Sequence, residues 1–174
     1  MKKQQFSILM GSMFALAVSA QTNWKVDNSH SKIGFSVTHM MVGETEGKFK
    51  LYEGKVSSTS ETDFNNANIE FTVDVNSINT DDDRRDGHLK SDDFFNAVKF
   101  PKMTFKSTSM KKGKAVGEYI MEGNLTIRDI TKKVTLTAVT SGKSVKDPYG
   151  LTRVGFKRSE EHTSELQSRG LISY

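Results

Sequence analysis

The chain contains no cysteine and only two prolines among its 174 residues. The absence of cysteine excludes disulfide bonds, so the fold has to be stabilised by a buried apolar core, which a chain of this length is able to form. It also excludes the lipobox that would anchor an exported protein to lipid. The hydrophobic pattern shows neither a second core nor a linker, which predicts a single domain.

Motifs of common enzyme classes are also missing from the sequence. There is no nucleophile elbow, no glycine-rich phosphate loop, no Ser/His/Asp constellation and no HExxH spacing. The formal net charge is +4, and lysines are spread singly along the alternating segments, where solvated strand faces explain them. These absences predict a protein that is not an enzyme, holds no metal or cofactor, and binds neither nucleic acid nor a charged membrane surface.

Residues 1–20 have the three parts of a secretory signal peptide. Two lysines give a positive start, residues 6–18 form an apolar stretch too short to span a bilayer, and the small residues that end at Ala20 resemble a cleavage site. We therefore expect a mature chain that begins at Gln21, is periplasmic or secreted, and has no stable membrane insertion after cleavage.

Residues 158–174 depart from the pattern of the rest of the chain. The segment 158–168 reads RSEEHTSELQS and is similar to the conceptual translation of a widely used sequencing adapter. The period-two alternation ends before it, at Lys157. We therefore expect an artefactual tail at 158–174, a truncated domain over 21–157, and the absence of one or more C-terminal strands that close the fold. The alternative is a natural helical tail.

Alternating apolar and polar residues dominate the segment between these ends and predict about eight strands. In the clearest case, Ile33, Phe35 and Val37 share one face and polar or small residues share the other. Short strands joined by turns are typical of an antiparallel sandwich or an up-and-down barrel, and alternation alone leaves both open. The predicted strands lie at 24–27, 32–39, 45–56 with a break, 69–76, 102–108, 117–127, 134–138 and 151–156.

One helical interruption is expected near 81–97. Thr80 precedes three aspartates that suit the positive end of a helix dipole, so its hydroxyl is the expected N-cap. Ser91, followed by two more aspartates, repeats the start signal, and Pro101 excludes further helix. The aspartates could supply an acid and base pair, but capping explains them without catalytic chemistry.

Ordered motifs run through the chain between residues 24 and 157. They are DNSHS at 27–31, FSVTH at 35–39, RDGHLKSDDFF at 85–95, FPKMTFKS at 100–107, GNLTI at 123–127 and VTL at 134–136. Together these motifs resemble the YceI-like family of secreted bacterial lipocalin-like proteins. The resemblance implies an antiparallel β-barrel around a long apolar cavity that holds a polyisoprenoid or similar lipid. A barrel of about eight strands has room for one small ligand.

The resemblance also implies that inward-facing side chains contact the lipid. His39 is in phase with the apolar stripe of 33–37, where it could meet a polar group of the ligand or be an ordinary core histidine. His88 could face the cavity from the helix or act as a cation at the helix end. The phenylalanines could line the cavity or pack the helical insertion against the barrel. The predicted ligand-binding residues are Phe35, Val37, His39, Phe71, Val73, His88, Phe94, Phe95, Phe105, Tyr119 and Met121.

Three hypotheses for the function remain. The leading one is a non-enzymatic periplasmic protein that binds, transports or stores a polyisoprenoid or similar long-chain amphiphile, with this lipid as its partner and no cofactor. The second is an enzyme that modifies such a lipid with His39 or His88 as general base. The third is a secreted interaction protein whose barrel is merely packed.

Overall fold

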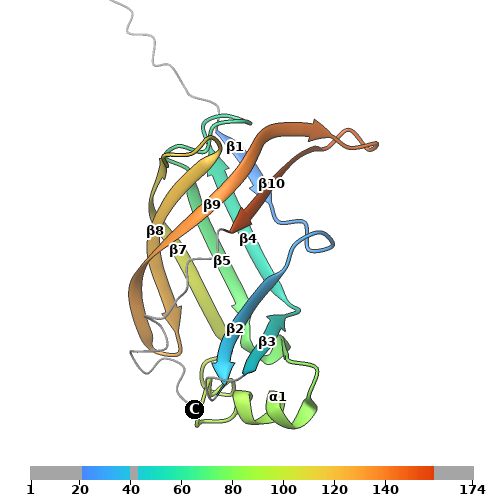
Figure 1. Cartoon of the computed structure of the whole chain (residues 1–174), viewed down its shortest axis with the longest axis vertical. Coiled ribbons are helices and arrows are strands. Elements are labelled where there is room, and N and C mark those ends of the chain that lie inside the picture. The colour runs from blue at the N-terminus through green and yellow to red at the C-terminus, as the bar shows by residue number, and fades with distance from the viewer. Residues whose placement is uncertain (1–20, 40–42, 159–174) are drawn as a thin grey trace, which may run out of the picture.

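The computed structural model of the chain describes residues 21–39 and 43–158. The predicted signal peptide at 1–20, and the predicted tail from residue 159 onward, lie outside these residues. The described part is mostly β-strand with one short α-helix, and it curls into a lipocalin-like antiparallel β-barrel (Figure 1). This arrangement confirms the predicted all-β class.

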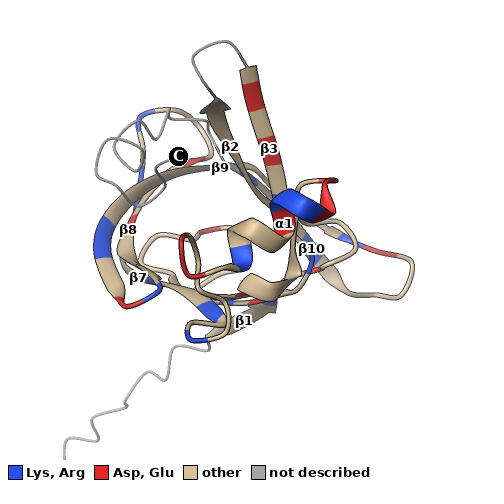
Figure 2. Ribbon diagram, turned by 90° about the horizontal axis from the view of Figure 1, so that it is seen from below, with Lys and Arg blue, Asp and Glu red and all other residues tan. Residues whose placement is uncertain are grey.

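Seven strands form one antiparallel sheet that wraps around the long axis of the molecule (Figure 1). In sheet order they are β1 (Thr22–Lys25), β4 (Tyr52–Ser58), β5 (Asn68–Asp74), β7 (Lys102–Lys112), β8 (Glu118–Ile127), β9 (Ile130–Lys146) and β10 (Thr152–Arg158). Strands β1 and β10 are therefore the two edges of the sheet. The view from below shows the curl of the sheet, with helix α1 (Asp83–Lys90) lying across that end (Figure 2).

A smaller antiparallel sheet lies at the same lower end, beside α1 (Figure 1). Its order is β2 (Ile33–His39), β3 (Gly43–Phe49) and β6 (Ile78–Asn79), and the short 3-10 helix η1 (Val75–Ser77) leads into β6. The broken strand predicted over 45–56 is thus two strands that belong to different sheets. In the described ranges, the chain has no helix with the length and apolar character needed to cross a membrane.

Helix α1 has Asp82 as its N-cap, so the predicted cap, Thr80, is wrong. Asp82 accepts a hydrogen bond from the backbone N–H of Arg85 at 3.0 Å. Thr80 is instead buried, and its backbone N–H and hydroxyl both donate to Asp86 Oδ1, at 2.8 and 2.6 Å. Because a buried hydroxyl needs a partner, this contact outweighs the capping preference of Thr80.

Ser91 ends α1 and does not begin a second helix. Its hydroxyl donates to the carbonyl of His88 at 2.7 Å, and residues 92–99 contain turns rather than helix. Asn96, with a φ of 48°, turns the chain through the left-handed region that asparagine tolerates. These turns carry two phenylalanines, Phe94 and Phe95, back against the core.

The core consists of two clusters, one near α1 and one near the opposite end of the barrel. The lower cluster, which includes a residue of α1, comprises Phe49, Tyr52, Val73, Val75, Ile78, Leu89, Ala97 and Met103. The upper cluster, which includes a residue of the loop between β4 and β5, comprises Phe64, Ala67, Ile69, Phe105, Met110, Tyr119 and Met121.

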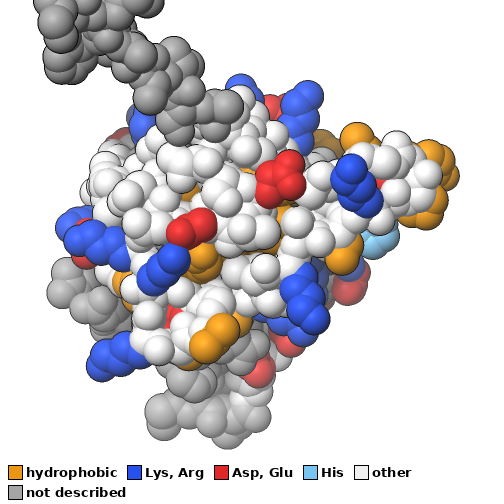
Figure 3. Space-filling model, turned by 90° about the horizontal axis from the view of Figure 1, so that it is seen from above, with side chains coloured by type: hydrophobic (Ala, Val, Ile, Leu, Met, Phe, Trp, Pro, Cys, Tyr) orange, Lys and Arg blue, Asp and Glu red, His pale blue; other side chains and the backbone are white. Residues whose placement is uncertain are grey.

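Phe64 closes the upper end of the barrel. Its side chain is 1% exposed, and its ring lies 5.8 Å from that of Trp24 and 4.7 Å from that of Phe156. The backbone N–H of Phe64 donates to the hydroxyl of Tyr119 at 3.2 Å, and this hydrogen bond fixes the loop between β4 and β5. The view onto this end shows side chains and backbone covering it without a visible opening (Figure 3).

Replacing Asp86 by alanine should lower the free energy of unfolding by about 1–3 kcal/mol, because two buried donors of Thr80 lose their acceptor. Urea denaturation of the mature chain would measure the change. Asp92→Ala, at an exposed position of the following turn, is the matched control and should stay within about 0.5 kcal/mol of wild type. Equal unfolding midpoints for the two variants would contradict the role assigned to Asp86.

Candidate functional site

The inward face of the seven-stranded sheet can be followed from strand to strand. Phe71 of β5 lies opposite Phe105 of β7, Phe105 lies opposite Leu125 of β8, and Met121 of β8 lies opposite Leu136 of β9. Directly opposite residues point to the same side of a sheet, and all five pack in or against the upper cluster. These side chains face inward as the alternation predicts, while their role as ligand contacts stays a prediction.

The predicted contact residues fall into two groups by burial. The buried group is Val37, Val73, Phe105, Tyr119 and Met121. The half-buried group is Phe35, Phe71, Phe94 and Phe95. Only the second group keeps apolar surface that a bound molecule would cover, so the first group forms the wall behind it.

Further half-buried apolar side chains complete the inward face but are missing from the sequence-based list. They are Trp24, Val56, Leu125, Val134, Leu136 and Val154, all packed against the upper cluster. The alternation signal could have found them, because each lies in phase with an apolar stripe of its strand.

Two phenylalanine rings of this face, and a third in the smaller sheet, lie over glycines of a neighbouring strand. The pairs are Phe35 with Gly47, Phe71 with Gly54 and Phe105 with Gly123. A Cβ atom on Gly54 would lie 2.4 Å from Cγ2 of Val26 and 2.5 Å from Cε1 of Phe71, and both distances are far too short. The missing side chains therefore let the rings lie against the wall. At Gly123 the ring of Phe105 occupies the space that a side chain would take.

Of the two predicted histidines, only His88 has a side chain among the described residues. His39 ends β2 opposite Gly43, and its side chain lies outside the described residues. The expectation that His88 faces the cavity is wrong, since its side chain is 61% exposed. It packs edge-on against the ring of Phe94 at 4.8 Å and lies 3.4 Å from Asp93. Across the described ranges, no group of three potential ligands is arranged to hold a metal ion.

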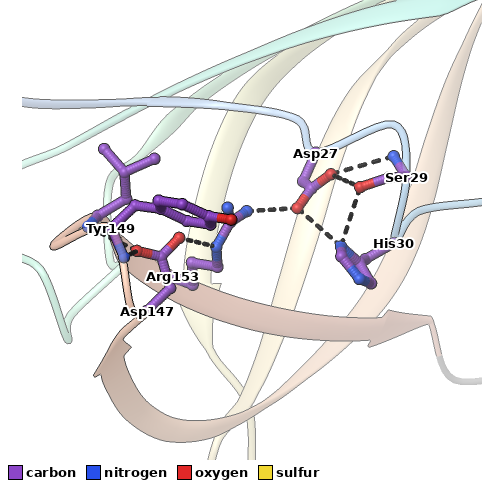
Figure 4. A network of polar contacts seen from close by, with 7 residues as sticks. Asp27, Ser29, His30, Asp147, Tyr149 and Arg153 are labelled. Carbon is purple, nitrogen blue, oxygen red and sulfur yellow. Dashed lines mark hydrogen bonds and ion pairs between the residues drawn. The ribbon is translucent and has the colours of Figure 1, made fainter.

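Asp27, Ser29 and His30 form a polar cluster in the loop after β1 (Figure 4). The hydroxyl of Ser29 donates to Asp27 Oδ1 at 2.5 Å, and His30 Nδ1 lies 3.0 Å from Ser29 Oγ and 2.9 Å from Asp27 Oδ2. A catalytic triad uses both ring nitrogens, one toward serine and one toward aspartate, whereas a single nitrogen serves both here. The cluster is therefore a turn motif. Hydrogen bonds from Ser29 and from His30 hold the pKa of the Asp27 carboxyl well below its ordinary value.

Arg153 joins this loop to the hairpin between β9 and β10. Its Nη1 contacts Asp27 Oδ2, and its Nε donates to Asp147 Oδ2 at 2.8 Å (Figure 4). Asp147 also accepts from the backbone N–H groups of Tyr149 and Leu151, each at 2.9 Å, so it shapes the hairpin turn. Because β1 and β10 are the sheet edges, this side-chain bridge holds the two edges together.

The sequence matches the YceI-like domain family over residues 24–167. A relative from Shewanella denitrificans is 34% identical over 166 residues, which cover 94% of this chain and 85% of that protein. Protein YceI of Salmonella newport is 34% identical over 160 residues, which cover 90% of this chain and 82% of that protein.

Solved structures of other proteins resemble the fold of this chain over most of its length. The YceI protein of Campylobacter jejuni superposes with a TM-score of 0.61 at 29% identity and covers 78% of this chain and 77% of its own. BcnA of Burkholderia cenocepacia superposes with a TM-score of 0.61 at 27% identity and covers 67% of this chain and 71% of its own. Sequence and structure thus agree on the barrel.

Replacing Gly54 by alanine should lower the free energy of unfolding by about 1–3 kcal/mol, because the new methyl group collides with the side chain of Val26 and with the ring of Phe71. Phe71→Leu should lower the free energy of unfolding less in the Gly54→Ala background than in the wild type, and a double-mutant cycle would measure this difference. Gly155→Ala, which meets no atom within 4 Å, is the control. Additive effects at positions 54 and 71 would refute the coupling.

The Asp27 cluster should make the stability of the fold depend on pH in the acidic range. The pKa of the Asp27 carboxyl is lowered in the folded state, so its stabilising contribution is present above the unfolded-state pKa of about 3.9 and is lost progressively as the pH falls below that value. Asp27→Asn should therefore lower the melting temperature at pH 7, and the gap to wild type should narrow between pH 5 and pH 2, as thermal scans would record. Asp129→Asn, at an exposed turn, should show no such narrowing.

Proposed function

This chain is a member of the YceI-like family, and we propose that the inward face of its barrel binds a polyisoprenoid or a similar long-chain amphiphile. The observation that supports this most directly is the row of half-buried apolar side chains on that face, including Phe71, Leu125 and Leu136. Apolar surface left uncovered inside a barrel is the surface that a hydrocarbon chain would bury.

The chemistry of the inward face suits a hydrocarbon better than a polar metabolite. Ser107 is one of its polar residues, and its hydroxyl already accepts from the backbone N–H of Ile69 at 2.8 Å. Each methylene removed from water contributes about 0.8 kcal/mol, so about ten buried carbons leave several kcal/mol after the cost of ordering. Binding by burial alone discriminates weakly between chains, so specificity for the hydrocarbon is loose.

The half-buried phenylalanines are the proposed contacts of the hydrocarbon. Phe35 and Phe95 flank Phe49 of the lower cluster, with ring centroids 5.8 and 6.1 Å from it, and Phe94 packs against the same cluster. Phe71 continues the apolar surface toward the upper cluster. A chain lying on these rings runs from the α1 end into the barrel. His39, at the end of β2, is retained as a predicted contact of a polar group.

Membership of the family supports a binding protein rather than an enzyme. The role that fits binding without turnover is that of a carrier or store for the amphiphile. The predicted signal peptide supports action in the periplasm or outside the cell. Both assignments belong to the proposal.

Organic extraction of the protein purified from the periplasm, followed by mass spectrometry, tests the proposal. Recovery of an intact long-chain amphiphile in stoichiometric amount is the expected result. A chemically converted product would favour the enzymatic alternative, and the absence of any co-purifying lipid would favour a barrel that is merely packed.

Replacing Leu136 by tryptophan should weaken lipid loading. The larger side chain fills part of the inward face and displaces roughly two methylenes of ligand, which corresponds to about a tenfold loss of affinity. The lipid recovered per protein would be measured by mass spectrometry. Thr135→Trp is the matched control, because Thr135 is the adjacent, exposed, outward residue. Equal loading of the two variants would show that the ligand does not lie on the inward face.

A further inference from the structure

Lys132 is a charged residue on the inward face of the barrel. In β9 it lies directly opposite Leu125 of β8 and two residues before Val134, and both of those side chains pack against the upper cluster. Opposite residues of an antiparallel pair, and alternate residues along a strand, share one face of a sheet. The stem of Lys132 therefore leaves the sheet on the apolar side, where the residue is half-buried.

Two outward lysines of the same sheet have a carboxylate partner. Lys133 Nζ lies 3.0 Å from Glu122, and Lys106 Nζ lies 2.9 Å from Glu70. For Lys132, the structure of residues 21–39 and 43–158 gives no carboxylate within ion-pair distance. The ammonium of a half-buried lysine gains from an anionic partner, and the lysine stem can extend along apolar surface to reach one. The sequence-based view of all lysines as solvated strand residues thus misses this one.

The position of Lys132 along the barrel is toward the α1 end. It follows the turn between β8 and β9, in which Arg128 is already engaged, because its Nη1 donates to the carbonyl of Phe94 at 2.9 Å and its guanidinium lies 5.7 Å from the ring centre of Phe100. The opposite end is closed over Phe64. A polar head group at the α1 end would keep contact with water while the hydrocarbon runs inward.

We propose that Lys132 binds the anionic head group, a phosphate or a carboxylate, of the amphiphile whose hydrocarbon chain lies on the inward face. The inference rests on the proposed function and adds the charge of the ligand to it. An ammonium acts as a point charge without fixed geometry, so it selects anionic over neutral head groups while tolerating variation in their shape.

Calorimetric titration of the lipid-free protein with farnesyl phosphate, farnesol and palmitate tests the inference. The readout is the ratio of affinities for farnesyl phosphate and farnesol, which share one hydrocarbon chain. Wild type should prefer farnesyl phosphate by about tenfold, as one charge-assisted contact gives. Lys132→Met should bring this ratio close to one, and Lys132→Arg should largely restore it. Lys133→Met, which removes an outward charge one residue away, should keep the wild-type ratio.

The outcomes separate this inference from the proposed function. A wild-type ratio near one, or a ratio unchanged in Lys132→Met, would overturn the head-group assignment while binding of farnesol still supports the apolar site. Failure of all three probes to bind would overturn both. Palmitate distinguishes the two anions: a Lys132-dependent loss for palmitate as well as for farnesyl phosphate supports any anionic head group, and a loss confined to farnesyl phosphate supports a phosphate. Because the ratio is compared within each variant, a general loss of folding does not imitate the expected result.

Discussion

The concave apolar face of the seven-stranded sheet is the constraint on which the rest of the structure depends. A curled sheet in a chain without cysteine has to cover this face with its own side chains. Phe64 covers it at the upper end, and α1 with β2 and β3 covers it at the lower end. The stretch between, around Phe71, Leu125 and Leu136, is left half-buried, so the cover that stabilises the fold also delimits the candidate site.

The edges of the sheet pose a second problem, because a barrel is stable only when its edge strands are paired or covered. Strands β1 and β10 occupy the edges, and the contact between Arg153 and Asp27 bridges them through side chains instead of a backbone ladder. Phe64 adds an apolar link, since its ring meets both Trp24 of β1 and Phe156 of β10. A seam held by side chains is more easily opened than a backbone hydrogen-bond ladder.

Strand facing could be predicted from the sequence, whereas the choice of helix cap could not. A strand with one solvated face must alternate, so the inward positions of Phe35, Phe71 and Tyr119 follow from local order alone. Thr80 and Asp82 are both good N-caps. The choice between them depends on the burial of Thr80 against Asp86, six residues further along the chain, and the local pattern does not show which of the two candidates is buried.

The degree of burial of each residue in the candidate site could not be predicted from the local sequence pattern either. Phe71 and Phe105 lie side by side on the inward face, yet only Phe105 is buried, because burial depends on which strands and loops lie across the barrel. The alternation of Lys132 with Val134 and Leu136 places all three on one face of the strand, but a lysine is ordinarily expected to be exposed to solvent. Its place at the end of an apolar wall separates two kinds of recognition. In the proposed binding mode, the hydrocarbon is held by many interchangeable contacts that discriminate weakly, and the charge of the head group is sensed at one residue, so tolerance for the chain and selectivity for the head group can change independently.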